Sequence, residues 1–279
     1  MKICIIGSGY VGLVSGACFS DLGNTVTCVD INREIIEKLN KGIIPIYEPG
    51  LQELVVRNLK KKRLLFTTDI SSSIKKSDII FICVGTPTKN NKADLKYVFN
   101  VTKSIKSNLN RYKIIVTKST VPVTTGDKIT KILKSNKNKN KFDVVSNPEF
   151  LREGEAIRDF QFPDRVVVGT SSNKANKIMK KLYLPLIKKG GRYFHTSRRS
   201  AELIKYASNA FLATKITFIN EIANLCEKSN IDVKEVAIGM GLDERIGSRF
   251  LRAGPAYGGS CFPKDTKALV STCLLYTSD

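Results

Sequence analysis

The feature that most constrains the fold is a glycine-rich turn near the start of the chain. Gly7, Gly9 and Gly12 form the pattern G-x-G-x-x-G directly after the β-rich run KICIIG, and a helical pattern follows. The next β-rich run, NTVTCVD, ends at Asp30. A strand, a tight glycine turn, a helix and a second strand ending in an acid are typical of the first βαβ unit of a parallel sheet.

The rest of the chain continues the alternation and then changes character. Runs such as DIIFICVGTP, KIIVTKSTVP and DRVVVGT alternate with helical patterns, which predicts an α/β fold with a Rossmann-like, doubly wound, mostly parallel sheet over residues 1–199. Residues 200–230 form a helical run without Gly or Pro, too long for a helix of the sheet layer. We therefore expect a helical central domain at 200–270, with a connecting or dimer-forming role. Residues 271–279 continue no pattern and are interpreted as a truncated or non-native tail.

Each residue of the glycine turn has a specific role in dinucleotide binding. Gly7 permits the tight turn, Gly9 lets the backbone approach a pyrophosphate, and Gly12 lets the helix pack on the strand. The helix N-terminus stabilises the phosphates. Asp30 would hydrogen-bond two ribose hydroxyls and repel a 2′-phosphate, which favours NAD over NADP, although Arg33 nearby tempers that preference.

Two later loops follow predicted strands and carry one threonine each. Thr86 lies in VGTPT and Thr120 in KSTVP. Loops at the carboxyl ends of parallel strands line the ligand crevice, so both threonines are candidate contacts to cofactor or water. Ordinary turn chemistry, with proline after threonine or valine, explains the same residues equally well. Tyr10 and Val11, inside the glycine motif, are further candidate cofactor contacts.

Hydride transfer from an alcohol requires a group that takes the proton, and the sequence offers few. The only histidine, His195, lies among polar residues, and we expect it to be structural or exposed. Lys205 and Asn209 share one face of the long helix; the pattern favours a solvated stripe over a buried site. Glu149 and Glu153 repeat that spacing, which a first helical turn rich in acids would also explain.

Cys261 lies in the stretch YGGSCFPKD, with Lys264 and Asp265 close behind it. A thiol near a lysine or at a helix N-terminus is favoured as a nucleophile. A lone cysteine is more often a core residue, but glycine-rich polar flanks are poor core surroundings. The sequence pattern leaves both interpretations open.

Composition excludes some classes of protein. The formal charge of +21 favours nucleic-acid binding or, more simply, solvated lysines over the whole surface; the one dense basic run, 131–141, has few aromatic residues to stack bases, and the second interpretation is preferred. The seven cysteines form no C-x-x-C pair, so we expect neither a disulfide framework nor a bound metal. No long apolar run and no basic leader is present, so we expect no membrane association and a cytoplasmic location.

Six motifs together resemble one family, the UDP-glucose/UDP-N-acetylmannosamine dehydrogenases, from residue 1 to about residue 270. They are GSGYVG, VGTPT, KSTVP, NPEFLREG, ELIKYASNAFLATKITFINE and DERIGSRFLRAGPAYGGSCFPKD. The resemblance implies a four-electron oxidation of UDP-glucose to UDP-glucuronate with two NAD. The length of the apolar helix near 200–230 favours a homodimer in the full-length form. The family continues into a second nucleotide-binding domain that completes the UDP site and is absent here. We therefore expect NAD binding with weak or no turnover.

The resemblance also implies residue roles. Cys261 would attack the aldehyde-level carbon to give a thiohemiacetal, a second hydride loss would leave a thioester, and water would hydrolyse it. Lys205 and Asn209 would stabilise the oxyanion, Asp265 with Thr120 would position water, and Glu153 would act as base. The implied cofactor contacts are Tyr10, Val11, Thr86, Thr120, Glu153 and Lys264. The implied substrate contacts are Glu149, Phe150, Leu151, Arg152, Lys205, Asn209, Phe250, Leu251, Arg252, Tyr257 and Gly258.

Three alternatives remain open at this stage. The sugar nucleotide could be UDP-N-acetylmannosamine or GDP-mannose, because the sequence does not place the side chains that contact the sugar. A two-electron dehydrogenase of the related hydroxyacid group would need no cysteine. A protein of another class, a non-catalytic NAD-binding fragment or a basic nucleic-acid binder, could use the same fold.

Overall fold

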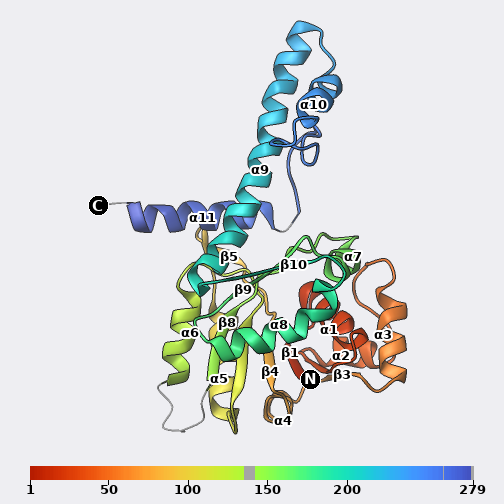
Figure 1. Ribbon diagram of the computed structural model, residues 1–279, viewed down its shortest axis with the longest axis vertical. Coiled ribbons are helices and arrows are strands. Elements are labelled where there is room, and N and C mark those ends of the chain that lie inside the picture. The colour runs from red at the N-terminus through yellow and green to blue at the C-terminus, as the bar shows by residue number, and fades with distance from the viewer. Residues whose placement is uncertain (135–141, 260, 278–279) are drawn as a thin grey trace. The chain divides into compact units, whose positions relative to one another are not determined.

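The alternating runs of the first part of the chain form a single sheet in the computed structural model, which describes residues 1–134, 142–259 and 261–277 (Figure 1). Within these residues the sheet has eight strands in the order β10-β9-β8-β7-β4-β1-β2-β3. The strands are β1 (Lys2–Ile6), β2 (Thr25–Val29), β3 (Leu64–Thr67), β4 (Ile79–Ile82), β7 (Lys113–Thr117), β8 (Phe142–Ser146), β9 (Arg165–Gly169) and β10 (Arg192–Thr196).

Six of these strands have the doubly wound order. From β3 through β2, β1, β4 and β7 to β8, all neighbours are parallel. Strand β9 pairs antiparallel with β8 at Ser146 and Gly169, and β10 runs parallel to β9. The strand order reverses between β1 and β4, and ligands of such sheets bind outside the carboxyl ends of the strands at that point. The predicted Rossmann-like, mostly parallel sheet is confirmed.

Side-chain alternation along the strands gives the sheet two apolar faces. Ile3 and Ile5 of β1 belong to one core cluster, whereas Cys4 and Ile6 belong to the other. Phe19 lies at the centre of the first cluster, with its ring 5.1 Å from that of Phe81. The first face packs against α1 (Tyr10–Asp21), α2 (Arg33–Asn40), α3 (Leu51–Lys60), α7 (Ala156–Gln161) and α8 (Asn173–Ile187). The second packs against α4 (Ile70–Lys76), α5 (Lys96–Asn108) and α6 (Thr125–Lys134).

The chain divides into two compact units. The first comprises Met1–Pro87 and Asp94–Leu203, and the second comprises Thr88–Ala93 and the residues from Ile204 onward. Helix α9 (Arg198–Ser229) starts in the first unit, and the second unit adds α10 (Val233–Gly241) and α11 (Phe262–Thr277). The described helices include none whose length and apolar character would suffice to cross a bilayer.

A short hairpin belongs to the second unit, although its sequence position lies inside the first. Strands β5 (Thr88–Lys89) and β6 (Lys92–Ala93) pair antiparallel, and β6 packs against α11. Asn90 and Asn91 both have positive φ, 51° and 58°, as a two-residue hairpin turn requires.

Three elements differ from the expectations. The hairpin was not predicted, because two-residue strands carry no readable alternation. Strand β10 was not predicted either, because this edge strand is mostly exposed and its residues RYFHT are polar. Helix α11 was not expected to reach into the tail at 271–279, yet it begins at Phe262 and continues to Thr277. The interpretation of that tail as truncated or non-native stays a prediction. Most of the basic run 131–141 lies outside the described residues.

Candidate functional site

The glycine turn of the first unit has the geometry of a dinucleotide-binding loop. Gly7 has φ +102°, and a Cβ atom there would lie 2.7 Å from the carbonyl oxygen of Cys83. A Cβ atom on Gly12 would lie 1.8 Å from the carbonyl oxygen of Gly7, whereas one on Gly9 would meet no atom within 4 Å. Helix α1 starts after Gly9 with no side-chain cap, so its first backbone N–H groups suit a pyrophosphate. The residues present therefore fit a bound dinucleotide.

Asp30, directly after β2, faces the same loop. One carboxylate oxygen accepts a hydrogen bond from the backbone N–H of Ser8 at 2.7 Å, and the other accepts one from Asn32 at 3.0 Å. A carboxylate has about four lone-pair directions, so acceptor capacity remains for ribose hydroxyls. Arg33 is exposed at the first residue of α2. Asp30 thus also fixes the glycine turn, a role that sequence reasoning did not assign to it.

The two threonine loops meet in the structure. Thr86 is buried after β4, and its hydroxyl donates to the carbonyl oxygen of Thr120 at 2.9 Å. Ser119 donates to the carbonyl oxygen of Val84 at 2.7 Å, so a second hydroxyl ties the same loops together. Thr86 therefore acts at least as a link between loops. The contacts of Thr86 and Thr120 to cofactor or water stay predictions.

The segment NPEFLREG has no helical turn. Residues 147–153 are irregular, and α7 begins only at Ala156. The interpretation of Glu149 and Glu153 as neighbours in a first helical turn is therefore wrong; the Asn-Pro pair before Glu149 favours an extended start. Glu149 is buried and accepts a hydrogen bond from the backbone N–H of Leu151 at 2.7 Å, while Glu153 is exposed.

Neighbouring side chains of this segment have local partners. The guanidinium of Arg165 lies 4.0 Å from the ring centroid of Phe150. Leu151 packs against the core cluster of the first sheet face. The guanidinium of Arg152 donates two hydrogen bonds to the carboxylate of Asp159, at 2.6 and 3.0 Å. These bonds raise the pKa of the guanidinium above its ordinary value. A sugar nucleotide that used Arg152 would compete with this ion pair.

Sequence reasoning missed two buried acids of the first unit. Tyr10 and Val11 open α1, and the Tyr10 hydroxyl donates to the carboxylate of Glu48, a residue of the segment between α2 and α3. Glu48 also accepts backbone hydrogen bonds from the segment that carries Glu153. Its only sequence signal is an acid before Pro49-Gly50, ahead of a helix.

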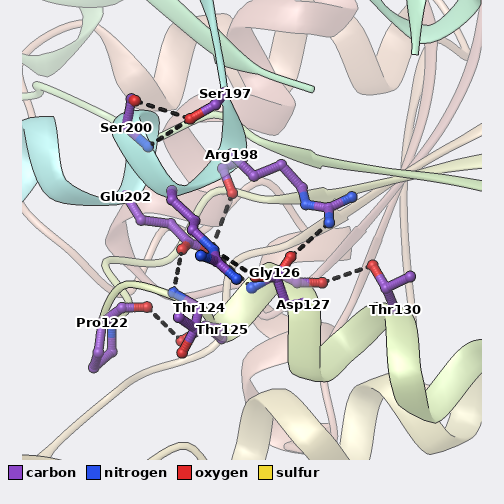
Figure 2. Close-up of polar contacts among 12 residues, drawn as sticks. Pro122, Thr124, Thr125, Gly126, Asp127, Thr130, Ser197, Arg198, Ser200 and Glu202 are labelled. Carbon is purple, nitrogen blue, oxygen red and sulfur yellow. Dashed lines mark hydrogen bonds and ion pairs between the residues drawn. The ribbon is translucent and has the colours of Figure 1, made fainter. Parts of the chain in front are cut away.

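The second missed acid, Glu202, lies in the first turns of α9. Figure 2 shows its carboxylate directed at the start of α6, where it accepts hydrogen bonds from Thr124 N at 2.8 Å and Gly126 N at 2.7 Å. Burial raises the pKa of Glu202 to about 7, against the hydrogen bonds, which lower it. In return, Arg198 of α9 donates to Asp127 of α6 at 2.6 Å. The start of α9 is therefore joined to the start of α6 by the hydrogen bonds of Glu202 and by the ion pair of Arg198 with Asp127.

Two polar residues of α9 in the second unit, Lys205 and Asn209, are buried. Lys205 is 4% exposed and Asn209 is 6% exposed, so the solvated stripe favoured by the pattern is wrong. Asn209 donates from Nδ2 to a carboxylate oxygen of Asp265 at 2.7 Å, and Asp265 is itself fully buried. Lys264 forms an ion pair with the same carboxylate. Tertiary packing, which the helix pattern does not report, buries the stripe.

Cys261 is exposed, so the interpretation as a core residue is wrong. Its carbonyl oxygen accepts the first hydrogen bond of α11, from the backbone N–H of Asp265 at 2.8 Å, which makes Cys261 the residue at the N-terminal cap of that helix. None of the seven cysteines, all within the described residues, forms a disulfide. The thiol is thus accessible, next in sequence to a helix start with a buried carboxylate in its first turn.

The loop before Cys261 contributes the remaining predicted substrate residues. Leu251 is buried and Arg252 and Gly258 are exposed. The rings of Phe250 and Tyr257 each lie 6.2 Å from that of Phe262. A cavity of about 700 Å³ lies beside this loop, within the second unit. It is lined by Asn91, Lys92, Tyr257, Thr266, Lys267, Val270, Ser271 and Leu274.

His195 belongs neither to the glycine turn nor to the loop before Cys261. It is on the edge strand β10, and its Nε2 lies 3.0 Å from the carbonyl oxygen of Thr170. The ring links β10 to the chain after β9. This placement agrees with the expected structural role.

Sequence comparison places both units in one group of enzymes. Residues 1–187 match the NAD binding domain of the UDP-glucose/GDP-mannose dehydrogenase family, and residues 199–277 match its central domain. The chain is 55% identical over 276 residues to UDP-glucose 6-dehydrogenase of Rhizobium meliloti, covering 98% of this chain and 63% of the relative. It is 56% identical over 271 residues to UDP-glucose 6-dehydrogenase TuaD of Bacillus subtilis, covering 96% and 58%. The chain thus spans about three fifths of the length of these curated relatives.

Solved structures give the same relationship. A UDP-glucose dehydrogenase from Pyrobaculum islandicum aligns with a TM-score of 0.94 at 39% identity, over 98% of this chain and 64% of that one. A GDP-mannose dehydrogenase from Pseudomonas aeruginosa aligns with a TM-score of 0.85 at 35% identity, over 100% of this chain and 66% of that one.

Proposed function

The chain belongs to the UDP-glucose/GDP-mannose dehydrogenase family, and from that premise we propose that it oxidises UDP-glucose to UDP-glucuronate with NAD. The observation that carries the proposal is the exposed Cys261 at the start of α11, ahead of the buried Asp265–Asn209 pair. Oxidation of an alcohol to an acid passes through an aldehyde, and an accessible thiol can hold that aldehyde covalently for the second oxidation.

The residue roles follow from this route. Two NAD molecules, bound in turn, would each accept one hydride, the second replacing the first NADH. The Cys261 thiolate forms a carbon–sulfur bond to the aldehyde carbon, and the carbonyl oxygen becomes the thiohemiacetal oxygen. Lys205 and Asn209 are donors for that oxygen. Loss of hydride leaves a thioester. Water attacks it and gives one proton to Glu153, and the carbon–sulfur bond breaks to release the thiolate and a carboxylic acid, which loses the second proton to solvent.

The remaining groups bind and orient. Asp265, held by Asn209 and Lys264, and Thr120 position the water. The glycine turn with Asp30 binds NAD, together with Thr86. The segment Glu149–Arg152 and the loop Phe250–Gly258 hold the sugar nucleotide. UDP-glucose is preferred over UDP-N-acetylmannosamine and GDP-mannose because the curated relatives reported above, at 55% and 56% identity, carry that substrate in their names.

The decisive experiment is the end-point yield of NADH with limiting UDP-glucose and excess NAD. An end-point yield does not depend on the rate of turnover once the reaction has run to completion. A yield near two NADH per UDP-glucose supports the four-electron reaction, and a yield near one contradicts it. Parallel titrations with the other two sugar nucleotides test the substrate. NAD binding without any NADH would contradict turnover by this chain while leaving the cofactor assignment intact.

Cys261→Ser is the matched variant for the thiol. We expect turnover to fall by at least about 10³-fold, because the covalent step has no other nucleophile. Cys273→Ser is the control, since Cys273 is also exposed and lies on the same helix α11. Equal NADH yields and rates from Cys261→Ser and the unchanged chain would contradict the thioester route.

A homodimer is proposed from the exposed apolar residues of α9. Phe211, Phe218 and Leu225 repeat every seven residues and are 66%, 48% and 60% exposed. A helix stripe of this spacing packs well against another helix. Static light scattering tests the assembly: Phe211→Ser combined with Phe218→Ser should give a monomer, and an unchanged mass would place any interface elsewhere.

We also propose a cytoplasmic location and no nucleic-acid partner. The absence of disulfides among the described cysteines is typical of a reducing compartment such as the cytoplasm. That the chain binds no nucleic acid stays a prediction. A salt-dependent shift with RNA near physiological ionic strength would contradict it.

A further inference from the structure

Glu48 is a buried carboxylate with an unusual set of partners. It is 4% exposed, in the irregular segment between α2 and α3. One oxygen accepts hydrogen bonds from the Tyr10 hydroxyl and from Gly154 N, the latter at 2.8 Å, and the other accepts one from Ile157 N at 3.3 Å. A buried charge is tolerated only with such partners, so all these groups depend on one another.

The partners lie on both sides of Glu153. The Tyr10 oxygen is 3.2 Å from Gly154 N and 3.4 Å from the carbonyl oxygen of Arg152. Gly154 has φ +86°, so the chain reverses there in a conformation that suits glycine. The peptide groups before and after Glu153 are therefore held by the same phenol–carboxylate pair, which leaves the Glu153 side chain exposed.

The phenol suits this role because it remains a donor. Burial and the hydrogen bond to Glu48 raise the pKa of Tyr10. Tyr10 also opens helix α1, directly after the glycine turn. The hydrogen bond between Tyr10 and Glu48 thus links the glycine turn to the segment that carries Glu153, the proposed base.

We propose that Glu48 is a positioning residue that, through Tyr10 and Gly154, fixes the backbone of Glu153 for attack of water on the thioester. The claim that Glu48 assists hydrolysis rests on the proposed function. The claim that Glu48 holds the backbone on both sides of Glu153 rests on the hydrogen bonds alone. An anchor of this kind acts on the hydrolysis step. Oxidation up to the thioester does not need it.

Amide hydrogen exchange tests the anchor without any turnover. In Glu48→Gln, exchange at Gly154 or Ile157 should rise about tenfold or more, because the amide has one acceptor oxygen where the carboxylate has two, and one of these N–H groups loses its acceptor. Exchange in strands β1 and β7 should stay unchanged, which shows that the sheet is intact. Glu53→Gln is the matched control, an exposed glutamate in the first turn of α3. Unchanged exchange at Gly154 and Ile157 would overturn the inference.

Acyl-enzyme trapping tests the positioning. With UDP-glucose and NAD, Glu48→Gln should accumulate the thioester on Cys261, detected as a mass increase after acid quench. The steady-state rate should fall about 10²-fold, the cost of a misplacement of about 1 Å. Faster amide exchange with a normal rate and no acyl-enzyme would overturn the positioning role and leave a structural anchor. Absence of NADH from the unchanged chain would instead contradict the proposed function, and amide exchange would still decide whether Glu48 holds the segment.

Discussion

The candidate cofactor loop of the first unit and the candidate thiol site of the second are built from different parts of the chain. The first consists mainly of backbone: two glycines, Gly7 and Gly12, that have no room for a Cβ, and N–H groups at the start of α1. The second consists of buried side chains on helices, namely Lys205, Asn209 and Asp265. Substitution of the crowded Gly12 should therefore cost much of the stability. Substitution of one side chain at the thiol site should lower the free energy of unfolding by a smaller amount.

The largest expected effect is from Gly12→Ala in the first unit. Its Cβ atom would lie 1.8 Å from the backbone oxygen of Gly7, and neither atom belongs to a flexible side chain. We expect the free energy of unfolding to fall by more than about 4 kcal/mol, because backbone itself must move. Urea unfolding followed by circular dichroism measures it.

Gly9→Ala is the matched control three residues away. A Cβ atom on Gly9 meets nothing within 4 Å, and its φ of −70° suits alanine. The stability should stay within about 0.5 kcal/mol. NAD binding, measured by calorimetry, should weaken about tenfold or more, since a methyl group forced into a packed contact costs about 1–3 kcal/mol. Equal stability of the Gly12→Ala and Gly9→Ala variants would break the contrast.

The same difference explains what the sequence could predict. The spacing of Gly7, Gly9 and Gly12 reports what the backbone must do, so the strand, turn, helix and Asp30 followed from the residues alone. Whether Lys205 and Asn209 are solvated or buried depends on packing, and the helix pattern favoured the wrong alternative. The role of Glu48 could not be predicted from the acid before Pro49-Gly50, because its partners Tyr10 and Gly154 are 38 and 106 residues away in sequence.

An intermediate effect is expected at Glu202, where a side chain holds backbone N–H groups. Its pKa is about 7 in the folded chain against an ordinary value of 4.5. A raised pKa means that the folded chain favours the protonated form, so this stability is complete below pH 4.5 and is lost as pH rises through 7. The free energy of unfolding should therefore fall by up to about 3 kcal/mol between these pH values. Urea unfolding at pH 5, 6, 7 and 8 measures the slope.

Glu202→Gln separates this residue from the other acids. The variant cannot titrate, so its unfolding free energy should vary less with pH over the same range. Glu221→Gln, an exposed glutamate of the same helix α9, should retain the slope of the unchanged chain. A Glu202→Gln slope equal to that of Glu221→Gln would show that other groups cause the pH dependence.

The smallest effect is expected from Asn209→Leu in the second unit. Leucine has the same branching and number of side-chain heavy atoms as asparagine but donates no hydrogen bond, so the buried Asp265 would keep Lys264 and lose its amide donor. An unsatisfied buried group costs about 1–3 kcal/mol, and urea unfolding at pH 7 should show a loss of that size. Thr214→Ala, at an exposed position of α9, should change the stability by less than about 0.5 kcal/mol. If Asn209→Leu and Thr214→Ala have the same free energy of unfolding, the buried Asp265 does not depend on the Asn209 amide. The stability of the thiol site would then not divide into contributions from single side-chain contacts.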